Sequence, residues 1–283
     1  MSAAREPFAR ATCSSVEYVD THAHLDDPAF DLDRERVIAA AVAAGVTRIV
    51  NIGYRPARWT STIALAHRHP QVAVAIGLHP HHADEFDAGT VDRIRDTIAS
   101  ARAVALGEIG LDYFRDGPPP AVQRAAFETQ LDLAVRLDIP IVIHQRAAEP
   151  DLIAVLAGFP KLPRLVLHSF DGSQRLADLG IERGWIFGVG GLATRASADA
   201  LRTVLATVPL ARLVLETDAP YLVPAGIKER RNVSANLAYL ASRLAPLWGV
   251  TGDALATATS ATAASLFGLG AAQTQAIAAG TAP

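Results

Sequence analysis

Eight short runs of apolar, often β-branched residues recur along the chain, and a stretch with a helical pattern follows each of them. This alternation is typical of parallel strands joined by crossover helices. Runs such as IPIVIHQ stay apolar on both faces until a polar residue ends them, as in strands buried between a core and a layer of helices. We therefore predict an α/β fold, a single (β/α)8 TIM barrel, with strands at Val16–Asp20, Thr47–Ile52, Val72–Leu78, Ala103–Glu108, Ile139–His144, Arg164–His168, Trp185–Val189 and Arg212–Glu216.

The length of 283 residues suits one such barrel, since this fold typically needs about 250 residues. No linker interrupts the series, and the GPPP run at Gly117–Pro120 is predicted to be a loop inside the fourth unit. Thr251–Phe267 predicts an additional C-terminal helix. We expect an N-terminal arm over residues 1–15, the barrel over 16–268 and a flexible tail over 269–283.

The net charge of −3 gives no sign of the basic surface with which proteins coat long nucleic acid, so any such contact is expected to be local. Cys13 is the only cysteine, which excludes an internal disulfide and a thiolate metal site. No apolar run is long enough for a signal peptide or for a membrane span, which needs about 20 residues. We expect a cytoplasmic protein without membrane association, and the sequence indicates no protein partner.

The most specific local signal is the HxH pattern His22-Ala23-His24, directly after the first predicted strand. Alternate residues of an extended segment point to the same side, so the two imidazoles can bind one ion. A pair of solvent-facing histidines is the alternative. The position after a buried strand favours a metal site, because barrel enzymes place their chemistry at the C-terminal ends of the strands.

Further imidazole and carboxylate groups stand at other strand ends, namely Glu108, His144, His168 and, two residues beyond Glu216, Asp218. Each alone is explained equally well as a hydrogen-bonded structural residue. Six such groups at one barrel mouth, counting the HxH pair, would be costly to bury without a cation that balances their charge. Together they predict a metal centre.

Five of the nine histidines remain. His79, after the third strand, is predicted at the mouth as a contact to substrate or phosphate. His81 and His82 follow in the same segment and are predicted on the loop surface. His67 and His69 fall at the end of the second helix, where a solvated helix terminus is the better interpretation.

Six motifs lie at strand ends in chain order: DTHAHLD at Asp20–Asp26, GLHPH at Gly77–His81, GEIGLDY at Gly107–Tyr113, the IxIHxR pattern at Ile141–Arg146, HSFDGS at His168–Ser173 and ETDAPYL at Glu216–Leu222. Together they resemble the motifs of the TatD family of metal-dependent deoxyribonucleases, from about Tyr18 to Phe267. The resemblance implies an amidohydrolase-type TIM barrel, a divalent-metal centre and hydrolytic removal of nucleotides from DNA ends.

The resemblance also implies two metal ions and the ligands of each. Two cations about 3.5 to 4 Å apart can share a water, lower its pKa and hold the attacked phosphate. Glu108 and Asp218 are the predicted catalytic residues, Asp218 as the acceptor of the water's proton. The ligand types suit Mg2+, Mn2+ or Zn2+. The implied ligands are His22, His24 and Asp218 for one ion, His144 and His168 for the other, and Glu108 for both.

Arg146 is the predicted phosphate clamp, because a guanidinium offers paired donors. An ion pair with Glu149 or Asp171 is the alternative. The chain departs from the family's usual sequence beside the ligands, with Ala147 at an acidic position, Asp171 in HSFDG and Val233–Ser234 after the eighth strand. These departures bear on the substrate more than on the metal site.

Four aromatic residues, Tyr113, Phe114, Phe170 and Tyr221, are candidates to line the mouth and stack a terminal base, with plain packing as the alternative. The predicted function is an end-directed deoxyribonuclease for single-stranded or frayed DNA, with DNA ends or a small nucleotide-containing molecule as substrate. One alternative is an amidohydrolase acting on an ester, lactone or amide, such as an aminoacyl ester on an RNA end. Another is a noncatalytic binding protein with a decayed site, which the complete ligand set disfavours.

Overall fold

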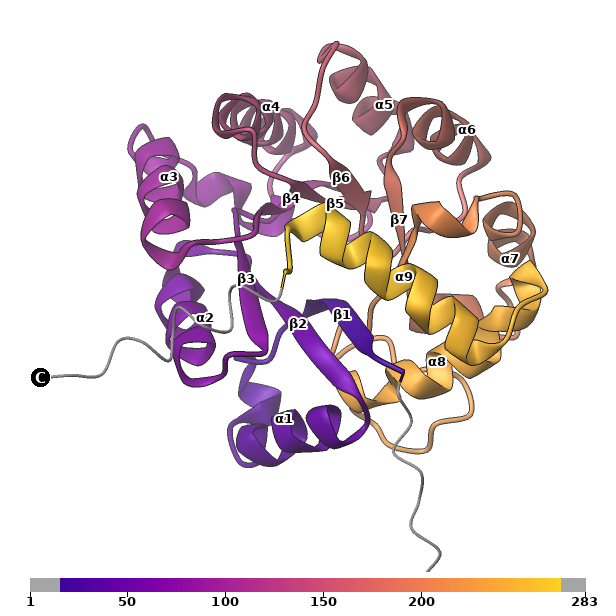
Figure 1. Ribbon diagram of the computed structural model, residues 1–283. Coiled ribbons are helices and arrows are strands. Elements are labelled where there is room, and N and C mark those ends of the chain that lie inside the picture. Colours follow the sequence, from indigo (N-terminus) through magenta and orange to yellow (C-terminus); the bar gives the residue numbers. More distant parts are fainter. Residues whose placement is uncertain (1–15, 271–283) are drawn as a thin grey trace, which may run out of the picture.

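The computed structural model of the chain describes residues 16–270. The expected N-terminal arm and residues 271–283 of the expected tail lie outside this part. Within it, eight parallel strands form one sheet in the order β1 to β8 (Figure 1). A bridge between Ala23 and Ala219 brings the two ends of the sheet together. The strands are β1 (Tyr18–Ala23), β2 (Val46–Gly53), β3 (Val72–Ile76), β4 (Ala105–Asp112), β5 (Ile141–Arg146), β6 (Leu165–Leu167), β7 (Ile186–Val189) and β8 (Leu213–Leu215).

Helices follow the strands and surround the barrel (Figure 1). Proline begins two of them, where its missing N–H leaves no donor unpaired, and the Ser173 side chain caps another by accepting from Leu176 N. None of the helices in the described part is long and apolar enough to cross a bilayer. They are α1 (Arg34–Ala43), α2 (Pro56–Arg68), α3 (Thr90–Ala101), α4 (Pro120–Leu137), α5 (Glu149–Ala157), α6 (Gln174–Arg183), α7 (Asp199–Leu205), α8 (Leu237–Leu244) and α9 (Gly252–Phe267), with short 3-10 helices η1 (Pro28–Phe30), η2 (Pro80–Glu85), η3 (Gly191–Thr194), η4 (Leu210–Arg212), η5 (Ser234–Asn236) and η6 (Ala245–Trp248).

The predicted TIM barrel with an added C-terminal helix is confirmed, but several strand ends differ from the prediction. β1 and β4 run three and four residues beyond their predicted ends at Asp20 and Glu108. The prediction ends both of these strands at an acidic residue. In the structure the polar side chains point into a site that the strands themselves line, so backbone pairing continues past them.

The inside of the barrel is filled by one buried apolar cluster that contains residues from all eight strands. Successive side chains of a strand point to opposite faces, so every second residue faces this interior. Two residues beyond the interior positions Val142 and Val166 come His144 and His168. The same alternation therefore places an apolar layer in the barrel and a polar layer at its C-terminal mouth.

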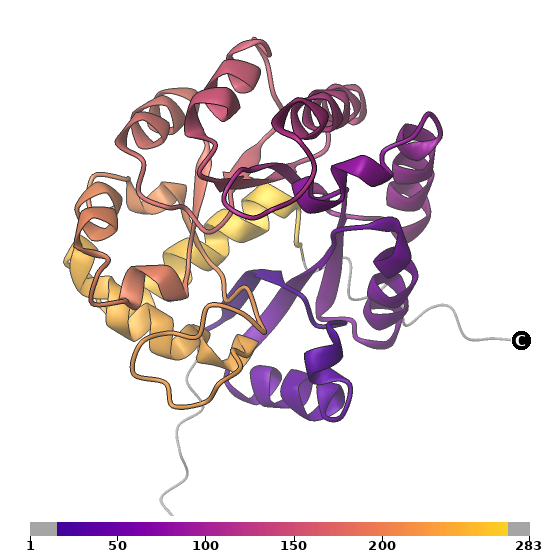
Figure 2. The ribbon, with the colours of Figure 1, turned by 180° about the vertical axis from the view of Figure 1, so that it is seen from behind.

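Helix α9 closes the opposite, N-terminal end of the barrel. Its Ser260 hydroxyl donates to Glu17 O just before β1, and Arg164, just before β6, donates to Ser265 O. Phe267 is only 4% exposed and belongs to the interior cluster. Figure 1 shows α9 across this end, and Figure 2 shows the other end, framed by loops such as the long segment between β8 and α8.

Truncation of Phe267 tests whether α9 is part of the core. Phe267→Ala is expected to lower the free energy of unfolding by about 3–5 kcal/mol, because it leaves a cavity against the barrel interior. Urea denaturation followed by circular dichroism measures this change. Leu32→Ala, at a fully exposed side chain (102%), is the matched control and should change stability by less than about 0.5 kcal/mol. Equal stability of the two variants would show that α9 does not seal the barrel.

Candidate metal centre

The first group of ligands lies where β1 meets the segment after β8. His22, His24 and Asp218 each offer one ligand atom, and these atoms lie within 4.8 Å of one another. Asp218 Oδ1 is 3.3 Å from His24 Nε2 and 3.8 Å from His22 Nε2. Backbone bonds hold this arrangement, because Asp218 N donates to His22 O at 2.8 Å and His24 N to Ala219 O at 2.7 Å. The contact between the first and last strands thus forms the group.

A second group contains His79, Glu108 and His144, whose ligand atoms also lie within 4.8 Å of one another. His144 Nδ1 is 2.6 Å from Glu108 Oε1, and His79 Nε2 is 3.8 Å from the same oxygen. His79 Nδ1 accepts a hydrogen bond from His81 N, which leaves Nε2 to face the carboxylate. The structure thus brings His79 to the mouth and places it among groups that can hold a metal, whereas the sequence indicated a contact to substrate or phosphate.

Glu108 lies between the two groups. Its Oε1 faces His144 and His79, while its Oε2 is 3.4 Å from His22 Nε2 in the first group. The register between β4 and β5 shifts here, since Gly107 pairs with Val142 and Ile109 with Ile143, so Glu108 has no partner residue. Such an extra residue in a strand redirects its side chain.

His168 faces both groups, and Glu216 orients it. Its Nε2 is 3.8 Å from Glu108 Oε1 and 3.9 Å from Asp218 Oδ1, while its Nδ1 is 3.1 Å from Glu216 Oε1. The Glu216 carboxylate also accepts from Ser169 N at 2.6 Å. A Cβ at Gly188 of β7 would lie 2.2 Å from Glu216 Oε2, so a larger residue there would displace the carboxylate. The sequence interpretation missed the role of Glu216, although it stands two residues before Asp218 in the same motif.

Asp112 holds two histidines on the other side of the mouth. Its Oδ2 is 3.1 Å from His144 Nε2 and 2.9 Å from His81 Nε2. The prediction of His81 as a loop-surface residue is therefore wrong, because it contacts a buried carboxylate. His82 is also partly covered and stacks on Tyr54 at a centroid distance of 5.8 Å. Two spacings in the sequence could have indicated these roles: His81 stands two residues after His79, and Asp112 stands four residues after Glu108.

Burial and the contacts between carboxylates and imidazoles set the ionisation of the centre. Burial alone would raise the pKa of Glu108, but the surrounding histidines, His22 first, hold it well below its ordinary value. Burial also lowers the pKa of His79 well below its ordinary value, so its imidazole is neutral. Burial opposes the charged form of His168, but the carboxylates of Glu216, Glu108 and Asp218 together outweigh it and raise its pKa to about 10. Ionised carboxylates and neutral imidazoles are the forms that bind metals, and binding at His168 would release a proton.

The residues fit a metal ion in a further respect. Both ring nitrogens of His22 are buried and have no hydrogen-bond partner among the described residues. Buried polar atoms are otherwise almost always paired, so an orphaned imidazole between two carboxylates marks a place for a ligand. Imidazole and carboxylate donors suit Zn2+, Mn2+ or Mg2+, and the centre offers no thiolate.

Arg146 lies at the rim of the mouth and does not form the ion pairs considered as alternatives. Its guanidinium Cζ is 3.9 Å from the centroid of the Phe114 ring. Glu149 instead pairs with Arg175 at 3.2 Å, and the amide of Gln145 lies 2.7 Å from the carboxylate of Asp171. Within residues 16–270 no side chain accepts a hydrogen bond from this guanidinium.

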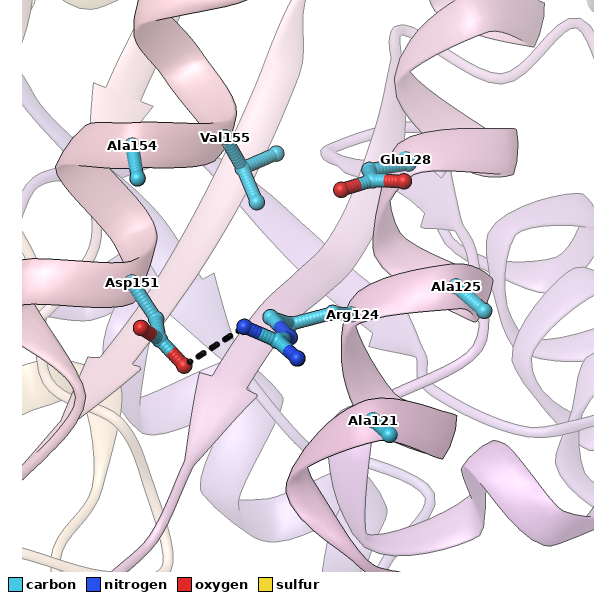
Figure 3. A pocket seen from close by; sticks show the side chains of 7 residues that line it. All are labelled: Ala121, Arg124, Ala125, Glu128, Asp151, Ala154 and Val155. Carbon is cyan, nitrogen blue, oxygen red and sulfur yellow. Dashed lines mark hydrogen bonds and ion pairs between the residues drawn. The ribbon is translucent and has the colours of Figure 1, made fainter.

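Tyr113 does not point into the mouth. Its hydroxyl donates to Asp151 at 2.8 Å, beside a pocket of about 320 Å³ between α4 and α5. Figure 3 shows this pocket, where Arg124 forms an ion pair with Asp151 at 3.4 Å. No predicted metal ligand lines the pocket. The contact of Tyr113 with α5 thus favours packing over stacking for this residue.

The other aromatic candidates divide between the core and the mouth. Phe170 is buried against Phe187 at a centroid distance of 5.0 Å, as its packing alternative predicts. Tyr221 is half exposed, its hydroxyl donates to Asp27 at 2.9 Å, and its ring lies 5.8 Å from that of His24. Tyr221 is therefore next to the first ligand group. Phe114 is exposed at the rim.

Comparisons with known proteins show the family to which the chain belongs. Residues 19–268 match the family model described as TatD related DNase. The 3′-5′ ssDNA/RNA exonuclease TatD of Citrobacter rodentium is 36% identical over 256 residues, which cover 88% of this chain and 97% of that protein. The Bacillus subtilis protein named uncharacterized metal-dependent hydrolase YabD is 33% identical over 250 residues, with coverage of 88% and 98%.

A solved structure supports the same relationship. The crystal structure of YjjV, a TatD homolog from Escherichia coli K12, has a TM-score of 0.83 and 33% sequence identity with this chain. The match covers 89% of this chain and 98% of that one. Because the family model matches most of the chain and these relatives match over nearly their full lengths, the chain belongs to the family of TatD related DNases.

Proposed function

We propose that this chain is a two-metal phosphodiester hydrolase that removes nucleotides from the ends of single-stranded or frayed DNA. The position of Glu108 between the two ligand groups is the observation that carries this proposal, since its two oxygens face different groups. A carboxylate in that position is suited to bridge two ions. The printed names of the family and of the Citrobacter relative, a DNase and an ssDNA/RNA exonuclease, support the substrate class.

Each residue has a role in this proposal. Two bound divalent cations would supply an activated water at neutral pH and stabilise charge on the phosphate. Asp218 accepts the proton of that water, since its carboxylate lies at the edge of the first group. Arg146, with unpaired donors, holds a phosphate, and Tyr221 lies beside the departing end. His79 contacts the substrate at the edge of the second group. The proposed ligands are His22, His24 and Asp218 for the first ion, His144 and His168 for the second, and Glu108 for both.

The amidohydrolase alternative shares the same metal chemistry, and no contact in the described residues favours it over phosphodiester cleavage. The noncatalytic alternative is weakened by the presence of every predicted ligand at one mouth. Hydrolysis of end-labelled single-stranded oligonucleotides by stripped protein, with Mg2+, Mn2+ or Zn2+ added back, tests the proposal. Turnover of an aminoacyl or other carboxylic ester without oligonucleotide cleavage would replace it with the amidohydrolase.

The number of ions is the first expected outcome. Equilibrium dialysis followed by elemental analysis is expected to find two divalent ions per wild-type chain. Glu108→Gln should reduce this number, because a neutral amide cannot balance the charge of two ions. A single ion in the wild-type protein, or two in Glu108→Gln, would contradict the shared role of Glu108.

Substitution of the proposed base gives a second outcome. Asp218→Asn is expected to reduce hydrolysis by about 100-fold or more, since the amide accepts no proton and binds metal weakly. Asp253→Asn, an exposed acid at the start of α9, is the matched control and should retain activity. Initial rates on a labelled oligonucleotide, with circular dichroism to verify folding, measure both. Full activity in Asp218→Asn would remove the residue from the proposed mechanism.

The form of the substrate is the third outcome. We expect rapid digestion of a linear single strand, slower digestion of a blunt duplex and none of a closed circular strand of matched sequence. The reason is that a recessed mouth admits a flexible end more easily than a stiff duplex, whose interior phosphates reach it only by deformation. Gel analysis of the three substrates decides the matter, and cleavage of the circle at the rate of the linear strand would rule out an end-directed enzyme.

A further inference from the structure

An exposed aromatic ring stands at the rim of the mouth and is not explained by packing. Phe114, just after β4, is 64% exposed, while most other large apolar side chains of the described part are buried. The guanidinium of Arg146 lies over one face of the ring, with Cζ 3.9 Å from its centroid. The exposure leaves ring surface open to solvent. Such an arrangement is typical of proteins that stack bases, which combine aromatic rings with arginine.

The ring is held in place by the backbone and by one buried carboxylate. Phe114 N and Arg115 N donate to Asp112 Oδ1 at 2.9 and 3.3 Å. Tyr113 N donates to Arg146 O at 2.9 Å, which continues the pairing of β4 with β5 up to the ring. The turn that carries Phe114 is therefore ordered before any ligand binds, so little conformational entropy is lost on stacking.

The same carboxylate connects the ring to the metal centre. Asp112 Oδ2 lies 3.1 Å from His144 Nε2, and the other nitrogen of His144 contacts Glu108 at 2.6 Å. Phe114 thus has a fixed position beside the second ligand group. A base that stacked on it would belong to the strand whose phosphate reaches that group.

We propose that Phe114 and Arg146 form a stacking subsite for a base of the bound strand, close to the cleaved bond. This inference rests on the proposed function. The ring stacks the base, and the guanidinium, whose N–H groups have no acceptor among the described side chains, binds a neighbouring backbone phosphate. Because every base has a π face, the subsite selects oligonucleotides over mononucleotides without reading sequence.

The test compares an oligonucleotide with a small phosphodiester. For wild type, Phe114→Ala and Phe114→Trp, kcat/KM is measured on a labelled oligothymidylate and on bis(p-nitrophenyl) phosphate, and the ratio of the two is taken. Phe114→Ala is expected to lower this ratio about 5- to 150-fold, through KM of the oligonucleotide. Phe114→Trp should restore it. Leu32 is an exposed apolar side chain two residues after η1, and Leu32→Ala should leave the ratio unchanged.

An abasic scan shows whether the contact is to a base. Oligonucleotides with one abasic position each are compared in wild type and in Phe114→Ala. At one position the missing base is expected to lower kcat/KM of the wild type by the same factor as Phe114→Ala does. In Phe114→Ala the same abasic position should have no further effect, because the ring and the base are the two partners of one interaction. Additive effects at every position, or an unchanged ratio, would overturn the subsite while oligonucleotide cleavage persists. If wild type cleaves neither substrate, the proposed function fails and the subsite fails with it.

Discussion

The contact between β1 and β8 is the constraint on which the site depends. Asp20, fully buried in β1, accepts hydrogen bonds from Thr217 N at 2.9 Å and from Thr217 Oγ1 at 2.6 Å. One residue on, Asp218 N donates to His22 O. A carboxylate buried this deeply is costly unless it is hydrogen-bonded, so these bonds specify how the first and last strands meet. Closure of the barrel and assembly of the first ligand group are therefore the same event.

Carboxylates behind the imidazoles give the centre its second level of order. Glu216 contacts Nδ1 of His168, and Asp112 contacts Nε2 of His144. In both histidines the other ring nitrogen faces Glu108. Such partners set the orientation and tautomer of a metal-binding histidine. β7 contributes to this order without a ligand, because Gly188 leaves the space that Glu216 occupies. β7 therefore affects the position of His168 although it contributes no side chain to the ligand groups.

The fold and the polar groups that gather at the mouth could be predicted from the sequence because both follow from one local rule. A strand buried on both faces is a nearly continuous apolar run, and a polar residue at its C-terminal end is conspicuous against it. The roles of Glu216, Asp112 and His81 depend instead on which strands become neighbours and how much space lies between them, which a local spacing can suggest but does not determine. Tyr113 was misplaced for the same reason, since its partner Asp151 comes from a different helix. The ends of β1 and β4 differ from the prediction because backbone pairing continues past their polar residues.

The packing of α9 against the N-terminal end of the barrel has a consequence for how substrate enters and product leaves. The barrel interior is filled with apolar side chains and covered by Leu266 and Phe267, so the described part of the chain has no passage from one end to the other. Whatever enters at the C-terminal mouth must also leave there. Substrate, water and product consequently all pass through the C-terminal mouth, and each product has to leave it before the next can form.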